Sequence, residues 1–160
     1  MVDMRAIKIA IDADGSPLGY ISWHNHHYNK SKIRVLRPSI KNEKFGVQRM
    51  ELLAIYFAIS DNLKVIKKLK RKKKTIIVRS DSKSTIEILN RKTEIRDDII
   101  RRIYNSIIRI LNKLSCRMIF NYLDRKKNIA GKILERLCKA HTFNFQNQKY
   151  YRFNSLIFFI

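Results

Sequence analysis

The chain has 160 residues, 45% of them hydrophobic, so it can form one globular domain with a buried core and is not a disordered chain. Its 35 Lys and Arg residues against 13 Asp and Glu residues give a formal net charge of +22. This surplus exceeds what solubility requires and favours a polyanionic partner, with nucleic acid first and an anionic membrane surface second.

Cysteine usage and the terminal segments indicate the cellular compartment. Cys116 and Cys138 have no further Cys or His at the spacing of a metal site, which excludes a zinc site or a disulfide framework. The N-terminus has no apolar run of signal-peptide type, and no stretch is long enough to span a membrane. We therefore expect a cytoplasmic protein with reduced thiols and no membrane partner.

The first third of the chain predicts an antiparallel meander. Residues 6–11 alternate as a strand, and residues 12–17 have the composition of a turn. Residues 18–23 are a second strand, close enough to be the hairpin partner of the first. Residues 32–37 are a third strand that ends at Pro38.

The remaining elements alternate between helix and strand. Residues 47–59 predict a hydrophobic helix, and residues 75–79 predict a β-branched strand that lies parallel to the first because a helix precedes it. Residues 117–123 are a fifth strand. Further helices are expected at residues 84–89, 95–114 and 128–141. The order predicts an α/β domain over residues 1–141, followed by an aromatic tail, residues 142–160, that is an extra strand or a partner surface.

Three acidic residues occupy informative places in this order. Asp12 closes the first strand and Asp81 closes the fourth, so both should emerge at the carboxyl edge of the sheet, where open α/β sheets place their ligands. Glu51 lies near the start of the long helix, beside its apolar stripe. Taken alone, Glu51 is a residue at the margin of the stripe that reaches solvent or pairs with Arg49 or a lysine. With Asp12 and Asp81 nearby, it becomes a candidate metal ligand.

Three carboxylates in one place repel one another unless cations neutralise them. Oxygen ligands without His or Cys suit hard cations such as Mg²⁺ or Mn²⁺. A pair of these ions can activate water and stabilise the leaving oxygen of a phosphodiester.

At three points the sequence resembles the type 1 ribonuclease H family. Residues 7–12 and the following hairpin resemble its first strands, residues 49–54 (Arg-Met-Glu-Leu-Leu-Ala) its helix motif, and residues 79–82 (Arg-Ser-Asp-Ser) its fourth-strand motif. The resemblance covers residue 7 to about residue 141. It implies a ribonuclease H-like fold: a five-stranded mixed sheet with strands 1, 2 and 3 antiparallel, strands 4 and 5 parallel to strand 1, and flanking helices.

The resemblance also implies an activity and a site. The activity is divalent-metal-dependent endonucleolytic cleavage of the RNA strand of RNA–DNA hybrids, which leaves 5′-phosphomonoesters. The site implied is Asp12, Glu51 and Asp81, acting as catalytic residues and as ligands to Mg²⁺ or Mn²⁺, with no small-molecule cofactor.

The chain departs from the family at the fourth carboxylate. The last helix of the family opens with Asn and then Ala-Asp-x-Leu, whereas here the run is Asn-Ile-Ala-Gly-Lys-Ile-Leu at residues 128–134. Counting from Asn128 places Lys132 at the acidic position, and pairing the alanines places Gly131 there. The histidine-bearing loop of the family is also missing, since residues 122–127 lead directly into Asn128.

Three alternatives follow from this departure. Asp124 or Glu135 supplies the missing oxygen, or Lys132 stands in as a fixed cation for part of the second metal's role. Otherwise the domain binds hybrid or double-stranded RNA with little or no cleavage. A further alternative has the same fold but a different reaction, which is either another nuclease reaction or strand transfer.

Other residues give weaker signals. Asp14 either contacts a metal or its waters or, more simply, caps the turn. His24, His26 and His27 are expected to be solvent-exposed in a hairpin turn without acidic partners. Through the resemblance or through their charge, nucleic-acid contacts are expected from Gln48, Ser82, Arg125, Lys126, Lys127 and Lys132.

Overall fold

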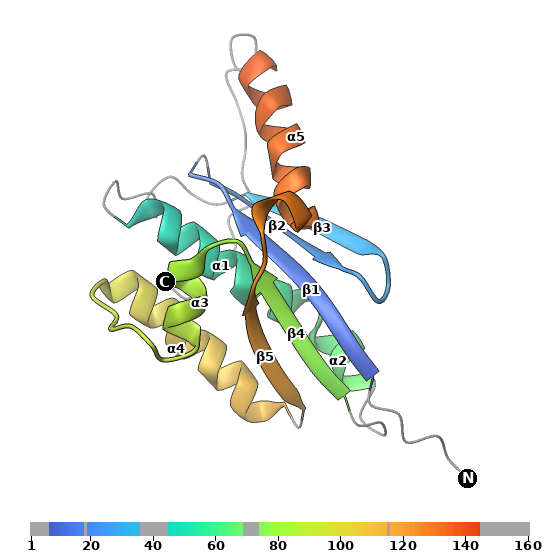
Figure 1. Cartoon of the computed structure of the whole chain (residues 1–160), viewed down its shortest axis with the longest axis vertical. Helices are drawn as coiled ribbons and strands as arrows, with labels where there is room; N and C mark the ends of the chain where they lie inside the picture. The colour runs from blue at the N-terminus through green and yellow to red at the C-terminus, as the bar shows by residue number, and fades with distance from the viewer. Residues whose placement is uncertain (1–6, 18, 36–44, 69–73, 115, 145–160) are drawn as a thin grey trace.

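The structure is a computed structural model that describes residues 7–17, 19–35, 45–68, 74–114 and 116–144, with side chains to residue 137. Five strands form one mixed sheet in the order β3-β2-β1-β4-β5 (Figure 1). β1 pairs antiparallel with β2 and parallel with β4, while β5 extends the parallel half. The strands are β1 (Ile7–Gly15), β2 (Tyr20–Asn25), β3 (Lys30–Val35), β4 (Lys74–Ser80) and β5 (Arg117–Tyr122).

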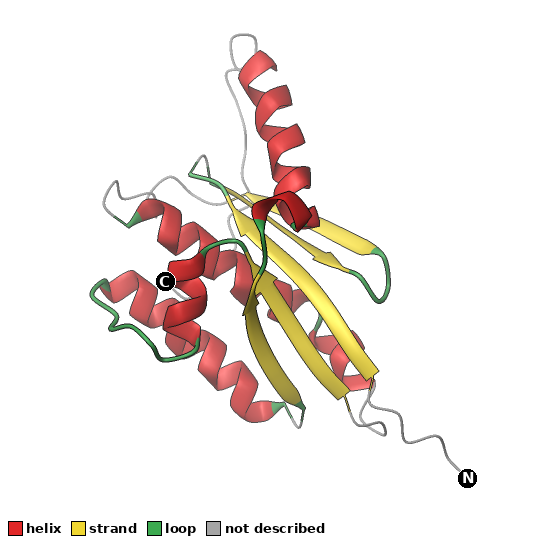
Figure 2. Cartoon of the chain, in the orientation of Figure 1, coloured by secondary structure: helices red, strands yellow, loops and turns green. Residues whose placement is uncertain are grey.

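Helices cover the two faces of the sheet unequally (Figure 2). The helix α1 packs on β1 and β2, α3 packs on β4 and β5, and α4 packs on α1. α5 lies on the opposite face, against β1 and β2, and extends beyond the end of the sheet (Figure 1). The helices are α1 (Gly46–Asp61), α2 (Leu63–Lys68), α3 (Lys83–Leu89), α4 (Asp98–Lys113) and α5 (Ile129–Asn144), with a 3₁₀ turn η2 (Arg125–Lys127) before α5.

Strand periodicity decides which side chains enter the core. Ile9, Ile11 and Ala13 of β1 point toward α1 and are at most 1% exposed. The even-numbered residues of β1, including Asp12 and Asp14, therefore lie on the face that carries α5. Both faces of β1 are covered near its carboxyl end, which is why that end can hold buried polar groups.

The central helix α1 is buried around most of its circumference because it lies between the sheet and α4. Arg49 is one of its two buried charged residues and forms a two-pronged ion pair with Asp97, with Nε–Oδ2 at 2.8 Å and Nη2–Oδ1 at 2.7 Å. Asp97 also accepts a hydrogen bond from the backbone N–H of Ile100 as the N-cap of α4. Arg49, which the sequence offered as an ion-pair partner for Glu51, thus pairs with Asp97 instead.

The predicted fold class is confirmed, including the parallel relation of β4 and β5 to β1. The predicted end of the first strand is wrong, since β1 continues through residues 12–15. The second strand likewise runs on through His24 to Asn25. Polar residues can continue β1 because β2 pairs with it as far as Gly15 and β4 pairs with it as far as Ala13, which satisfies backbone groups of this segment.

Some expectations fall outside the described residues. The end of the third strand at Pro38 lies there. So does most of the predicted tail: α5 includes residues 142–144, and the tail's role stays a prediction. Within the described part of the chain, no helix is both long enough and apolar enough to cross a membrane.

Candidate metal centre

Gly15 brings the backbone of β1 against the first turns of α1. A Cβ atom on Gly15 would lie 2.4 Å from the carbonyl carbon of Met50 and 2.7 Å from the backbone nitrogen of Glu51. No other residue allows this approach, because these are backbone atoms that cannot move aside. The Gly15 N–H then donates to Oε2 of Glu51 at 3.3 Å, which holds the carboxylate of Glu51 at the end of β1.

The register of the parallel pair fixes a second relationship. β4 residues pair with β1 residues 67 positions earlier, from Ile7 with Lys74 to Ala13 with Ser80. The same offset places Asp81, the first residue after β4, level with Asp14 and two residues beyond Asp12. Asp81 therefore faces Asp14 across the edge of the sheet.

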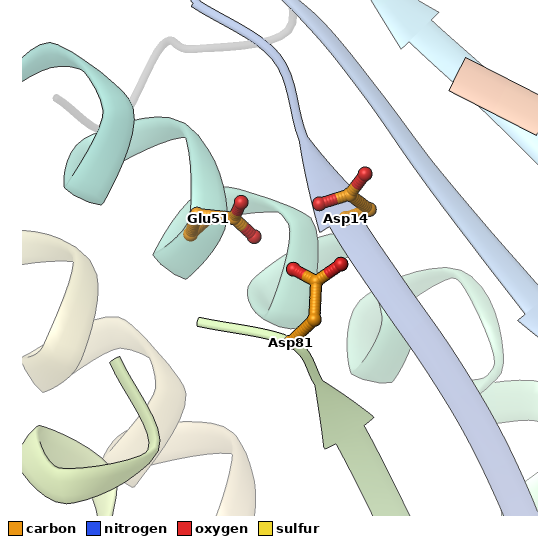
Figure 3. A group of neighbouring side chains, drawn as sticks. All are labelled: Asp14, Glu51 and Asp81. Atoms are coloured by element: carbon orange, nitrogen blue, oxygen red, sulfur yellow. The ribbon is translucent and has the colours of Figure 1, made fainter. Parts of the chain in front are cut away.

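Asp14, Glu51 and Asp81 converge on one point (Figure 3). One carboxylate oxygen from each lies within 4.8 Å of the other two. The three side chains come from β1, from α1 and from the residue after β4, so only the folded chain brings them together. Among the described residues, none of the three carboxylates is part of an ion pair.

The electrostatics of this cluster favour a cation. Burial and the neighbouring Asp81 carboxylate raise the pKa of Asp14 to about 6. Burial, followed by repulsion from Asp14, raises the pKa of Glu51 well above its ordinary value. Burial also raises the pKa of Asp81, against the opposing effects of Arg125 and a hydrogen bond from Asn128. The raised pKa of all three groups means that the site disfavours their ionised forms, which a bound cation would stabilise.

The start of α5 completes one wall of the cluster. The buried side chain of Asn128 donates to the carbonyl oxygen of Ala13 at 3.2 Å and accepts from the N–H of Gly131 at 3.2 Å, the bond of an N-cap residue. These bonds hold Gly131 against the cluster, with the position of its missing Cβ 3.3 Å from Oδ2 of Asp14. Gly131, rather than Lys132, is therefore the residue of α5 that faces the three carboxylates.

A pocket of about 230 Å³ opens onto the cluster. We call it the carboxylate pocket; the charged residues that line it are Asp14, Glu51, Asp81, Glu135 and Arg125. Glu135 lies one helical turn after Gly131 and forms a long ion pair with Arg125, with Nε–Oε1 at 3.5 Å. Both side chains are at least half exposed, so this pair holds Glu135 only weakly.

The expected place of Asp12 in the cluster is wrong, because β1 runs one more pair of residues before it reaches the edge. The Asp12 side chain is fully buried, and Oδ1 accepts from Nε of Arg79 at 2.7 Å. Its Oδ2 lies 2.7 Å from Nε2 of His26 and 3.4 Å from the backbone N–H of Ile129. Asp12 thus ties β4, the β2–β3 turn and the start of α5 together, and its oxygens are already bound.

The expectation for the histidines is also partly wrong. His24 is only 9% exposed, with Nδ1 at 2.6 Å from Oγ of Ser31. His26 was expected to have no acidic partner, but its Nε2 lies beside Oδ2 of Asp12. His27 is exposed as expected.

The structure also places the other predicted site residues. Asp124 does not line the carboxylate pocket: its Oδ1 accepts from the N–H of Lys126 at 3.1 Å and caps the 3₁₀ turn. Ser82 lies beside the site at the start of α3, with Oγ at 2.7 Å from Oγ1 of Thr85. Gln48 is half-buried one turn before Glu51. Arg125 lines the carboxylate pocket, while Lys126 and Lys127 of η2 and Lys132 of α5 are exposed.

The sequence does contain a signal for Asp14. Asp12 and Asp14 fall on the same face of a strand, and Gly15 directly follows Asp14. The turn-like composition of residues 12–17 obscures this alternation. A strand that continues to Gly15 carries both aspartates on one face, which makes Asp14 a candidate beside Asp12.

The donor set suits a hard divalent cation. It consists of carboxylate oxygens alone, it lies in a partly open pocket, and Glu51 is only 6% exposed. Mg²⁺ or Mn²⁺ matches such ligands better than zinc, which prefers His and Cys.

The mixed sheet in this strand order, with helices on both faces and acidic residues at the carboxyl edge of β1 and β4, defines a ribonuclease H-like fold. A family model described as reverse transcriptase-like matches residues 37–137, well over half of the chain, and the chain belongs to this ribonuclease H-like family. No curated protein sequence matches this chain significantly.

Solved structures share the fold at low sequence identity. A ribonuclease H1 called LC11, solved in complex with an RNA/DNA hybrid, is 18% identical with a TM-score of 0.67, and the match covers 82% of this chain and 98% of that one. The ribonuclease H1 of Halobacterium salinarum is 15% identical with a TM-score of 0.64, and the match covers the same shares of the two chains. The N-terminal ribonuclease H domain of a Mycobacterium tuberculosis protein is 12% identical with a TM-score of 0.57, covering 84% and 99%.

Proposed function

We propose that this protein is a divalent-metal-dependent endoribonuclease that hydrolyses the RNA strand of RNA–DNA hybrids. The observation that carries the proposal is the convergence of Asp14, Glu51 and Asp81, with oxygens within 4.8 Å of one another, at the carboxyl edge of β1 and β4. Membership of a ribonuclease H-like family supports the reaction class. The likeness to a ribonuclease H1 that was solved with a hybrid supports the substrate.

Asp14, Glu51 and Asp81 would hold Mg²⁺ or Mn²⁺. When bound, the cation would supply an activated water and stabilise charge on the departing 3′ oxygen. In the reaction, the water oxygen forms a bond to phosphorus as the bond to the 3′ oxygen breaks, leaving a 5′-phosphate and a 3′-hydroxyl. The chain's own contribution is positioning: Gly15 orients Glu51, and Asn128 orients Asp81 and the start of α5.

The net charge of +22 supports binding of a polyanion around this negative pocket. Arg125, Lys126 and Lys127 extend from the turn beside the pocket, where they would contact phosphates of the substrate. Gln48 and Ser82 flank the carboxylates and would donate hydrogen bonds to the minor groove of the hybrid.

A second candidate function is hybrid binding with little or no cleavage. The observation that favours it is Gly131, which leaves no carboxylate where α5 meets the other three. Glu135 lines the same pocket and is the remaining candidate for a fourth oxygen.

Cleavage of a hybrid labelled on its RNA strand, with Mg²⁺ or Mn²⁺, tests the proposal. We expect short products with 5′-phosphates, and we expect Asp14→Asn and Asp81→Asn each to abolish them. Single-stranded RNA and duplex DNA are the substrate controls. Intact hybrid that is bound but not cut by the wild-type protein would favour the second candidate over the first.

A further inference from the structure

A second pocket lies at the far end of α1, ten residues and about 15 Å along the helix from Glu51. It encloses about 500 Å³ between the β2–β3 hairpin and the junction of α1 with α2. We call it the hairpin pocket; its lining includes Trp23, Tyr28, Lys30, Lys32, Lys64 and Val65. None of these residues belongs to the carboxylate pocket.

Strand register explains why cations and an aromatic ring share this pocket. Trp23 pairs with Lys32 and Asn25 pairs with Lys30, so both lysines lie on the face of β3 that continues the α1 side of the sheet. Lys64 reaches the same space from the first turn of α2. The ring of Tyr28 stands at the hairpin turn and is 43% exposed.

The floor of the pocket is fixed by buried polar contacts. Asp61 accepts from Nε1 of Trp23 at 2.8 Å and from Nε of Arg34 at 2.8 Å. The side chain of Asn62 accepts from Asn25 at 3.0 Å and donates to the carbonyl oxygen of Ala58 at 2.6 Å. The single carboxylate in the lining is therefore neutralised by Arg34, and the lysines give the pocket a positive character.

The two pockets thus have opposite character. The carboxylate pocket carries four acidic side chains and one arginine, while the hairpin pocket carries three lysines and one paired aspartate. An exposed aromatic ring beside lysines is the combination that binds an unpaired nucleotide, since the base stacks on the ring and the phosphates contact the ammonium groups. A paired base would not offer its face to Tyr28.

We infer that the hairpin pocket is a binding site for single-stranded nucleic acid, separate from the carboxylate pocket. Tyr28 stacks on a base, and Lys30, Lys32 and Lys64 contact the adjoining phosphates. This inference does not depend on metal binding or on hydrolysis at the carboxylate pocket.

Trp23 is the only tryptophan of the chain and lines this pocket at 3% exposure, so its fluorescence is the intrinsic probe of this pocket. The experiment is a titration of the full chain, without metal, with an oligothymidylate of about eight nucleotides, a length within the usual range for one such site. We expect a saturable change in Trp23 fluorescence. Tyr28→Ala should weaken binding about tenfold, and Tyr28→Phe should leave it nearly unchanged.

The lysines have a matched control. In a triple variant, Lys30→Ala, Lys32→Ala and Lys64→Ala are combined. The slope of log affinity against log salt should become shallower by about 2, because each lost phosphate contact contributes about 0.7. The control removes three other exposed lysines, Lys8, Lys92 and Lys113, and so has the same net charge. An equal loss in both triple variants, or no change in Trp23 fluorescence, would overturn the inference.

Two further arms separate the sources of the ligand and the two pockets. Thymidine monophosphate that saturates the site as tightly as the oligonucleotide would overturn the assignment to a strand in favour of a free nucleotide. Asp14→Asn should leave the Trp23 response intact while abolishing hydrolysis of hybrid. Loss of the response in Asp14→Asn would show one shared site and overturn the separation of the two.

Discussion

A side chain on Gly131 would begin 3.3 Å from Oδ2 of Asp14, so the first turn of α5 meets the end of β1 at the candidate metal centre. This contact identifies Gly131, and not the exposed Lys132, as the position from which a fourth carboxylate would reach the other three. The place where α5 meets the cluster is thus held by a residue with no side chain.

Gly131→Asp should therefore restore a fourth ligand. We expect its affinity for Mn²⁺ or Mg²⁺ to rise about tenfold, which corresponds to about 1.4 kcal/mol. Hydrolysis of hybrid should rise with it. Isothermal titration calorimetry measures the first effect, and Gly131→Asn, which has the same shape without the charge, is the control. Equal affinities in the Asp and Asn variants would contradict the assignment of this position.

The two aspartates of β1 should respond in opposite ways to loss of charge. Asp14→Asn removes repulsion in the cluster, so we expect the metal-free protein to gain about 1–2 kcal/mol of unfolding free energy at pH 7, allowing for partial solvent screening. Asp12→Asn leaves Arg79 and His26 without their carboxylate, so we expect a loss of about 2 kcal/mol or more. Urea unfolding without metal measures both.

The same pair of variants tests the metal ligands. Added Mg²⁺ should stabilise the wild-type protein and the Asp12→Asn variant but not the Asp14→Asn variant, since only Asp14 lies in the cluster. The opposite result is a metal-induced rise in melting temperature that disappears in Asp12→Asn and persists in Asp14→Asn. It would show that Asp12, as expected from the sequence, is the metal ligand and Asp14 is not.

Gly15→Ala should destabilise the fold and disturb Glu51 together. The added methyl would overlap the backbone of Met50, which can be relieved only if β1 and α1 separate. We expect a loss of about 3 kcal/mol in unfolding free energy and weaker metal binding. Gly131→Ala is the control, because its methyl would meet a carboxylate oxygen at 3.3 Å rather than backbone. Similar losses in both variants would contradict this explanation.

The Arg49–Asp97 ion pair gives the fold a specific acid sensitivity. The hydrogen bond from Arg49 lowers the pKa of Asp97 below its ordinary value of 3.8. A lowered folded-state pKa means that this stabilisation is fully present above the unfolded value and is lost as the pH falls through the folded value. The loss should therefore occur below about pH 4.

Asp97→Asn tests this acid sensitivity. Because it removes the carboxylate charge that faces the buried guanidinium of Arg49, we expect a cost of about 3 kcal/mol at pH 7. The deficit relative to wild type should shrink as the pH falls below about 4, where Asp97 becomes protonated in the wild type. Urea unfolding at several pH values measures the difference, with the exposed neighbour Asp98→Asn as control. A deficit that is constant across this pH range would contradict the prediction.

The sequence by itself determined the order of the strands and helices, apart from α2, and its resemblance to a known family determined the fold class. It also determined two of the three converging carboxylates. Periodicity identified α1 as a buried helix, and Glu51 and Asp81 follow from their places on α1 and after β4. These features are local, since they depend on which residues are apolar along a short stretch and on where that stretch ends.

Only the tertiary structure decided the rest. The choice of Asp14 over Asp12 depends on the register of β1 against β4, and a shift of two residues keeps the same face, so alternation cannot distinguish the two. The choice of Gly131 over Lys132 depends on how α5 is held by Asn128, Ala13 and Asp12 across the sheet. The register joins residues 67 positions apart, and the docking of α5 joins residues 115 and 117 positions apart, which no local pattern contains.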